Sequence, residues 1–157
     1  MGILLAAEDI VDIAVALETR GELFYREAAR HSQEPESRAL FDYLANEERR
    51  HKAFFEQLTP GILTTEVAPA AWEEAAAYIE DTVGRAFFQP DAPIQKVAVA
   101  ATQSERIQQA IQFEQQTILF FYTFRDLMRQ EHRDLLDQVI AEERRHVRRL
   151  SAMLADE

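Results

Sequence analysis

A five-residue motif that could bind metal occurs twice in the sequence. The run from Glu47 to His51 reads Glu-Glu-Arg-Arg-His, and the run from Glu142 to His146 repeats it letter for letter, 95 positions later. Residues three or four positions apart share one face of a helix, so Glu-x-x-His directs a carboxylate and an imidazole to one point. Oxygen and nitrogen ligands of this kind suit Fe(II) and Mn(II).

Each motif contains two glutamates, and their neighbours indicate which one points inward. Apolar residues lie one turn before and after Glu143, whereas Glu142 has the polar neighbours of a solvated face. In the first motif apolar residues flank both candidates, and the repeat then favours Glu48 over Glu47. The motifs therefore predict four ligands, Glu48, His51, Glu143 and His146. A substitution Glu142→Ala is expected to be nearly silent.

Two more carboxylates interrupt apolar stripes in helical segments. Glu18 lies between Val11 and Tyr25 on one stripe, and Glu114 lies among isoleucines and alanine on another. A glutamate is almost never fully buried unless it is paired or binds metal. Four buried carboxylates and two neutral imidazoles carry a charge of about -4, which two divalent cations would cancel. We therefore expect Glu18 and Glu114 to complete a dinuclear site.

The residues around this site allow more than one interpretation. Tyr25 and Tyr122 could hydrogen-bond a ligand carboxylate, although packing in an aromatic core explains them equally well. The four arginines of the two motifs are expected to form a solvated, salt-bridged face rather than an anion site. In a third interpretation the carboxylates stay protonated and the chain is a helical interaction module without metal.

The elements that must position these residues are four long helices. Helical periodicity predicts them over 8–30, 35–58, 103–128 and 133–153, with Pro35 as a first helical residue. Short links join the helices within two hairpins, 8–58 and 103–154, and a crossover over 59–102 contains a shorter amphipathic helix at 70–82. These features predict one all-α domain, a four-helix bundle with one long crossover, as in ferritin-like folds. The repeat indicates a duplicated helical hairpin.

Composition excludes several other classes of protein. Acidic residues outnumber basic ones by 28 to 17, so the net charge of -11 argues against nucleic-acid binding. The chain has no cysteine, which rules out disulfides and thiolate-ligated metal centres within it. No apolar run approaches the ~20 residues of a membrane span, and we expect a soluble cytoplasmic protein without a membrane partner.

The six ligands together make the chain resemble the rubrerythrin branch of the ferritin-like superfamily. The resemblance implies a non-haem di-iron oxidoreductase that reduces hydrogen peroxide or dioxygen, and it implies a homodimer. Usual rubrerythrins carry a rubredoxin domain with four cysteines, so a chain without cysteine would need an external electron donor. They also bring an extra carboxylate near the residue corresponding to Glu114, where this sequence has only non-acidic neighbours such as Thr117.

Two alternatives use the same ligand set. The first is a ferroxidase that oxidises and stores iron in a larger assembly. The second is a manganese site, because Mn(II) and Fe(II) favour similar oxygen and nitrogen ligands.

Overall fold

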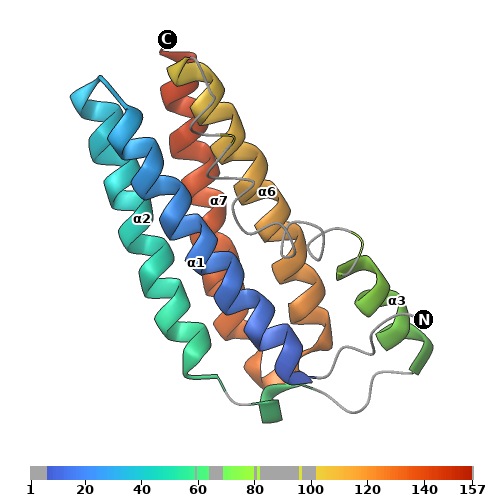
Figure 1. Cartoon of the computed structure of the whole chain (residues 1–157). Helices are drawn as coiled ribbons and strands as arrows, with labels where there is room; N and C mark the ends of the chain where they lie inside the picture. Colours follow the sequence, from blue (N-terminus) through green and yellow to red (C-terminus); the bar gives the residue numbers. More distant parts are fainter. Residues whose placement is uncertain are drawn as a thin grey trace.

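The computed structural model describes residues 7–58, 60–63, 69–79, 81, 96 and 102–156. Its main body consists of four long helices that lie side by side (Figure 1), namely α1 (Ala7–His31), α2 (Pro35–Glu56), α6 (Gln103–Leu127) and α7 (Arg133–Ala155). Every expected end of these four long helices lies within two residues of the observed one. The predicted all-α four-helix bundle is therefore confirmed.

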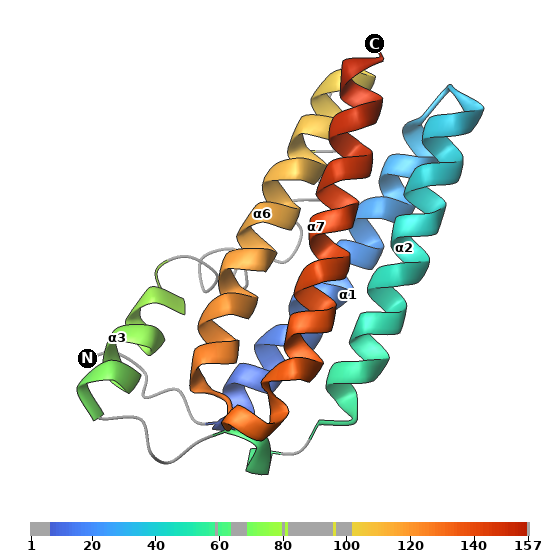
Figure 2. The same ribbon diagram turned by 180° about the vertical axis from the view of Figure 1, so that it is seen from behind.

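The helices form two antiparallel hairpins, α1 with α2 and α6 with α7 (Figures 1 and 2). The second hairpin begins at the end of the bundle opposite to where α2 stops, so the link between them must connect the two ends of the bundle. This is the predicted crossover connectivity. Much of the expected crossover lies outside the described residues; within it, the short helix α3 (Pro69–Ile79) lies beside α6.

Local sequence signals explain where the helices begin. Pro35 occupies the first turn of α2, where its missing N–H leaves no broken hydrogen bond. At the start of α6 the Thr102 hydroxyl accepts from the Glu105 N–H at 3.1 Å, and the Glu105 side chain accepts from the Thr102 N–H at 2.9 Å. This reciprocal capping box satisfies two backbone donors. The link between α6 and α7 is a 3-10 turn, η3 (Gln130–His132).

The buried core is divided into two apolar parts by a polar layer. One part, the Phe121 cluster, includes Leu17, Phe55, Phe121 and Ile140. The other, the Phe41 cluster, includes Tyr25, Phe41, Ile107 and Leu150. Along every one of the four helices, the predicted ligands fall between the residues of these two clusters. Each cluster therefore seals one side of the polar layer from water.

Smaller elements close the end of the bundle at which α2 stops. The short 3-10 turn η1 (Pro60–Ile62) is tied to the α6–α7 link by a backbone hydrogen bond from Arg129 to Ile62 at 2.8 Å. Trp72 of α3 is partly buried against the Phe121 cluster, which attaches the crossover helix to the bundle. No helix in the described part of the chain is long and apolar enough to cross a membrane.

Candidate metal centre

The six predicted ligands meet in the polar layer at the middle of the bundle. Helices α1 and α6 each contribute one glutamate, and α2 and α7 each contribute a glutamate and a histidine one turn later. All six side chains are at most 2% exposed, namely Glu18, Glu48, His51, Glu114, Glu143 and His146. The structure thus brings the whole predicted set together.

The six residues form two overlapping groups. Glu18 and His51 lie with Glu48 and Glu143 in the first group, and in the second Glu114 and His146 lie with the same two glutamates. Within each group one potential ligand atom per residue lies within 4.8 Å of all the others. Each group therefore offers three carboxylates and one imidazole, and Glu48 and Glu143 are common to both.

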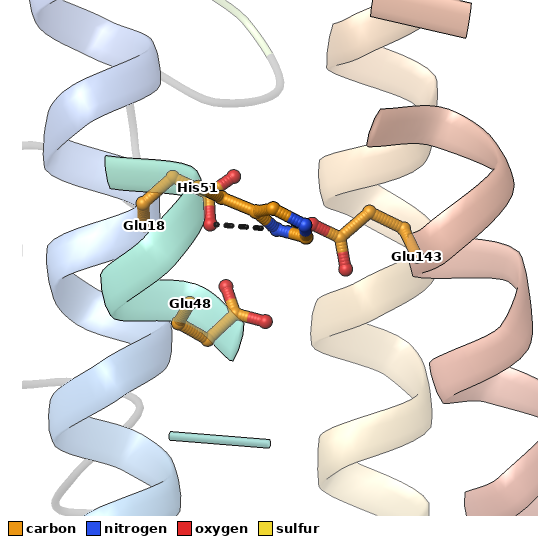
Figure 3. Close-up of side chains that lie close together, drawn as sticks. All are labelled: Glu18, Glu48, His51 and Glu143. Atoms are coloured by element: carbon orange, nitrogen blue, oxygen red, sulfur yellow. Dashed lines mark ion pairs between the residues drawn. The ribbon is translucent and has the colours of Figure 1, made fainter. Parts of the chain in front are cut away.

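Glu143 lies between the two imidazoles. Its Oε1 is 2.8 Å from Nδ1 of His51, and its Oε2 is 2.8 Å from Nδ1 of His146. Glu18 Oε2 approaches the same nitrogen of His51 at 3.6 Å, and Figure 3 shows the His51 ring extending from α2 between Glu18 and Glu143. Both histidines therefore direct Nδ1 into the cluster.

Most ligand atoms in the cluster lack a hydrogen-bond partner in the described part of the protein. Both carboxylate oxygens of Glu18, Glu48 and Glu143 are buried without one, as are Glu114 Oε2 and Nδ1 of each histidine. Buried polar atoms are almost always hydrogen-bonded, so a concentration of unpaired ones requires another partner. Oxygen and nitrogen atoms converging from four helices fit divalent metal ions, which would satisfy them.

Burial and crowding shift the pKa of three of these carboxyl groups upward. Burial raises the pKa of Glu18 and of Glu48 well above the ordinary value, and the charge of Glu143 adds to both effects. Burial, followed by the Glu143 charge, raises the pKa of Glu114 to about 7. Without a bound cation, burial therefore favours the protonated form of Glu18 and Glu48, and Glu114 keeps its proton below about pH 7.

The pKa values of the fourth carboxyl group and of the two imidazoles shift in the direction opposite to the one that burial alone would cause. Burial would raise the pKa of Glu143, but the adjacent His146 and His51 outweigh it and lower this pKa to about 2. Burial would lower the pKa of both histidines, but neighbouring glutamates raise it to about 9 for His51 and about 10 for His146. Without metal, Glu143 is thus an anion between two imidazolium rings.

Tyr25 contacts the cluster, whereas Tyr122 does not. The Tyr25 hydroxyl is fully buried and donates a hydrogen bond to Oε1 of Glu114, while its ring packs in the Phe41 cluster. Tyr122 is 36% exposed, and no contact between it and the ligands is found among the described residues. Of the two tyrosines, Tyr25 is thus the one whose hydroxyl reaches a predicted ligand.

The backbone at Gly21, one turn after Glu18, leaves space for Glu48. A Cβ atom at this position would lie 2.6 Å from Oε2 of Glu48 and 3.0 Å from its Cδ. The same position in the second half is Thr117, whose hydroxyl donates to the Phe113 carbonyl at 3.0 Å. Helical periodicity alone does not identify this glycine, because its contact with α2 exists only in the packed structure.

The outer glutamates of the two motifs are not simply solvated. Glu47 and Glu142 are 20% and 23% exposed, and Arg50 forms salt bridges with both, as expected for this arginine. Glu142, however, also accepts a hydrogen bond from Nε2 of His51 at 2.6 Å. The expectation that Glu142 faces only solvent is therefore wrong, since its carboxylate reaches across to the other hairpin.

Comparison with known proteins adds an independent observation to this geometry. The family model for rubrerythrin matches residues 9–154. The chain belongs to the rubrerythrin family. No curated protein and no solved structure gave a match. Membership of the rubrerythrin family and the buried carboxylate and histidine cluster together support a metal-binding site in the centre of the bundle.

Proposed function

We propose that this chain is a non-haem di-iron protein whose two ligand groups each hold one iron ion. The observation that carries the proposal is that the groups share Glu48 and Glu143. Glu48 and Glu143 would each contribute to holding both ions, while Glu18 with His51 and Glu114 with His146 would complete the separate positions. The bound cations would replace the protons and imidazolium charges that neutralise the cluster without metal.

We further propose that hydrogen peroxide or dioxygen is the substrate. When bound, a pair of Fe(II) ions supplies two electrons, one from each ion, so that peroxide is reduced without release of a one-electron radical. The Phe121 and Phe41 clusters would exclude bulk water from both sides of the layer. Tyr25 holds Glu114 through its hydroxyl and can fix the orientation of that carboxylate.

The electrons for repeated turnover would come from a separate donor. The 157 residues contain no cysteine, so the chain itself has no thiolate-ligated redox centre. A peroxidase cycle therefore requires a reducing partner. Without one, the reaction would stop after a single oxidation of the bound iron.

An anaerobic Fe(II) titration of metal-free protein tests the proposal directly. Two tightly bound ions per chain are expected, and a Glu48→Gln variant should bind fewer because it loses a shared ligand. A Glu131→Gln variant serves as the control, since Glu131 is exposed and lies outside the cluster. Binding of no iron, or equal binding by the Glu48→Gln variant, would contradict the dinuclear site.

The loaded protein is then mixed with peroxide or with dioxygen in a stopped-flow instrument. Rapid oxidation of two irons by peroxide, followed by re-reduction with an artificial donor, is the expected result. Accumulation of ferric iron well beyond two per chain would instead favour the ferroxidase and storage alternative. Replacing Fe(II) by Mn(II) in the same experiment tests the manganese alternative.

A further inference from the structure

The two nitrogens of His51 serve different partners. Nδ1 faces the cluster, 2.8 Å from Glu143 and 3.6 Å from Glu18, while Nε2 lies 2.6 Å from Oε2 of Glu142. The His51 side chain is 1% exposed, whereas that of Glu142 is 23% exposed. Glu142 therefore holds the ring from the outer side of the polar layer.

The carboxylate of Glu142 is itself fixed by Arg50. Nη2 of Arg50 donates to Oε2 of Glu142 and, at 2.9 Å, to Oε2 of Glu47. Arg50 and His51 are consecutive residues of α2, while Glu142 belongs to α7, and Figure 2 shows these two helices on the same side of the bundle. The contact thus joins a histidine of one hairpin to a carboxylate of the other.

The corresponding contact at the second histidine is not formed. Glu47 occupies the repeat position of Glu142, but its Oε2 lies 3.9 Å from Nε2 of His146, beyond hydrogen-bond distance. Arg50 engages this carboxylate instead. The edge of the Tyr43 ring faces the His146 ring, with centroids 6.4 Å apart. The two halves therefore support their histidines differently although their motifs are identical.

We propose that Glu142 is a positioning residue for His51 and makes the two metal positions unequal. A carboxylate that accepts from Nε2–H fixes the tautomer and orientation of a ligating imidazole and strengthens its other nitrogen as a ligand. The ion held by Glu18 and His51 is therefore bound more tightly than the ion held by Glu114 and His146. This inference rests on the proposed dinuclear function.

Titration of metal-free protein with Co(II), followed by its visible absorption, measures the two binding steps. Wild-type protein is expected to bind two ions in unequal steps, and Glu142→Ala should weaken the tighter step by roughly 10–100-fold. The repeat-matched control Glu47→Ala should leave both steps nearly unchanged. Glu142→Gln, whose amide oxygen still accepts from Nε2–H, should restore much of the lost affinity. Equal effects of Glu47→Ala and Glu142→Ala, or no effect of either, would overturn the inference.

Imidazole nitrogen NMR of the metal-free variants supplies a readout that does not depend on metal. In Glu142→Ala the ring nitrogen signals of His51 should move, while those of His146 should stay; unchanged His51 signals would overturn the positioning role. A wild-type protein that binds neither Co(II) nor Fe(II) would refute the proposed function and the unequal positions, while the His51 signals would still decide whether Glu142 holds the ring. Thermal unfolding of each variant shows whether the fold is intact.

Discussion

Protons neutralise the buried cluster when no metal is present. Glu18 and Glu48 retain theirs because burial raises their pKa values, and both imidazoles are charged because their pKa values lie near 9 and 10. Both imidazoles thus carry an extra proton at pH 7, and a bound metal ion would displace it together with the protons that burial favours on Glu18 and Glu48. Metal binding and proton release are therefore linked at the level of single side chains.

Replacing Glu114 by glutamine should stabilise the metal-free protein while weakening metal binding. Above its pKa of about 7 Glu114 is a buried anion, and Glu114→Gln removes that charge but keeps an acceptor for the Tyr25 hydroxyl. At pH 8 we expect a gain in the free energy of unfolding on the order of 1–3 kcal/mol. Denaturant unfolding at pH 8 and Co(II) titration measure the two effects.

The pH dependence provides the control for this prediction. At pH 5 wild-type Glu114 is protonated, so the stability advantage of Glu114→Gln should largely disappear. Unchanged Co(II) affinity in the variant would mean that Glu114 is not a ligand.

The inner ligands could be predicted from sequence, whereas their outer supports could not. Apolar neighbours at helical spacing placed Glu143 inward, and the repeat then selected Glu48. The contact of Glu142 with His51 depends on the distance between α2 and α7, which periodicity along one helix does not encode. The additional glutamate of each doublet is the available signal for such a support, but polar neighbours along the helix assign the outer one, Glu142, to a solvated face.

At the scale of the elements, close approach of α1 to α2 depends on Gly21. Gly→Ala in a helix interior normally stabilises by about 1 kcal/mol, but here the added Cβ would lie 2.6 Å from Oε2 of Glu48. In the metal-free protein Gly21→Ala should therefore show little of the usual gain. We expect Co(II) binding at both positions to weaken, because Glu48 belongs to both ligand groups.

The repeat-related substitution is the natural comparison for this glycine. Thr117→Ala removes a hydroxyl that is bonded only to the backbone of its own helix among the contacts described, so metal binding should change little. Thermal unfolding and Co(II) titration of both variants measure the difference. Wild-type affinity in Gly21→Ala would show that the Glu48 side chain adapts without cost.

Helix boundaries followed from the sequence to the extent that local signals determine them. Pro35 marked the start of α2 correctly because its ring permits only a first-turn position. The link between α6 and α7 contains neither glycine nor proline, so no strong local signal specifies its 3-10 turn at Gln130–His132. The short helix that was expected over 70–82 begins one residue earlier, at Pro69, and is observed as far as Ile79.

For the molecule as a whole, stability without metal should fall as the pH rises. The raised pKa of Glu114 contributes stability that is complete below its unfolded value and is lost as pH approaches about 7. The raised pKa values of His51 and His146 act in the same direction, and their contribution is lost as pH rises through about 9 and 10. Glu143, with its pKa lowered to about 2, contributes a constant amount above pH 5.

Metal should reverse this trend, because its ligands bind without their protons. A fixed Mn(II) concentration, chosen as 100 to 1,000 times the dissociation constant at pH 7, should stabilise the protein at that pH by about 3–4 kcal/mol. The difference from a chelator-treated sample should grow between pH 6 and pH 8. Thermal unfolding across this range measures it, and a difference independent of pH would contradict the proton-linked site.

Each hairpin carries half of the proposed ligands: one glutamate on its first helix and one Glu-x-x-His on its second. Two identical copies of such a hairpin, related by a twofold axis, would hold a complete dinuclear set. Within this chain the two hairpins nevertheless differ in the residues around the predicted ligands. The first hairpin has Gly21 at the position where the second has Thr117. Glu142 accepts a hydrogen bond from His51, whereas Glu47, at the matching position, lies too far from His146 to do so.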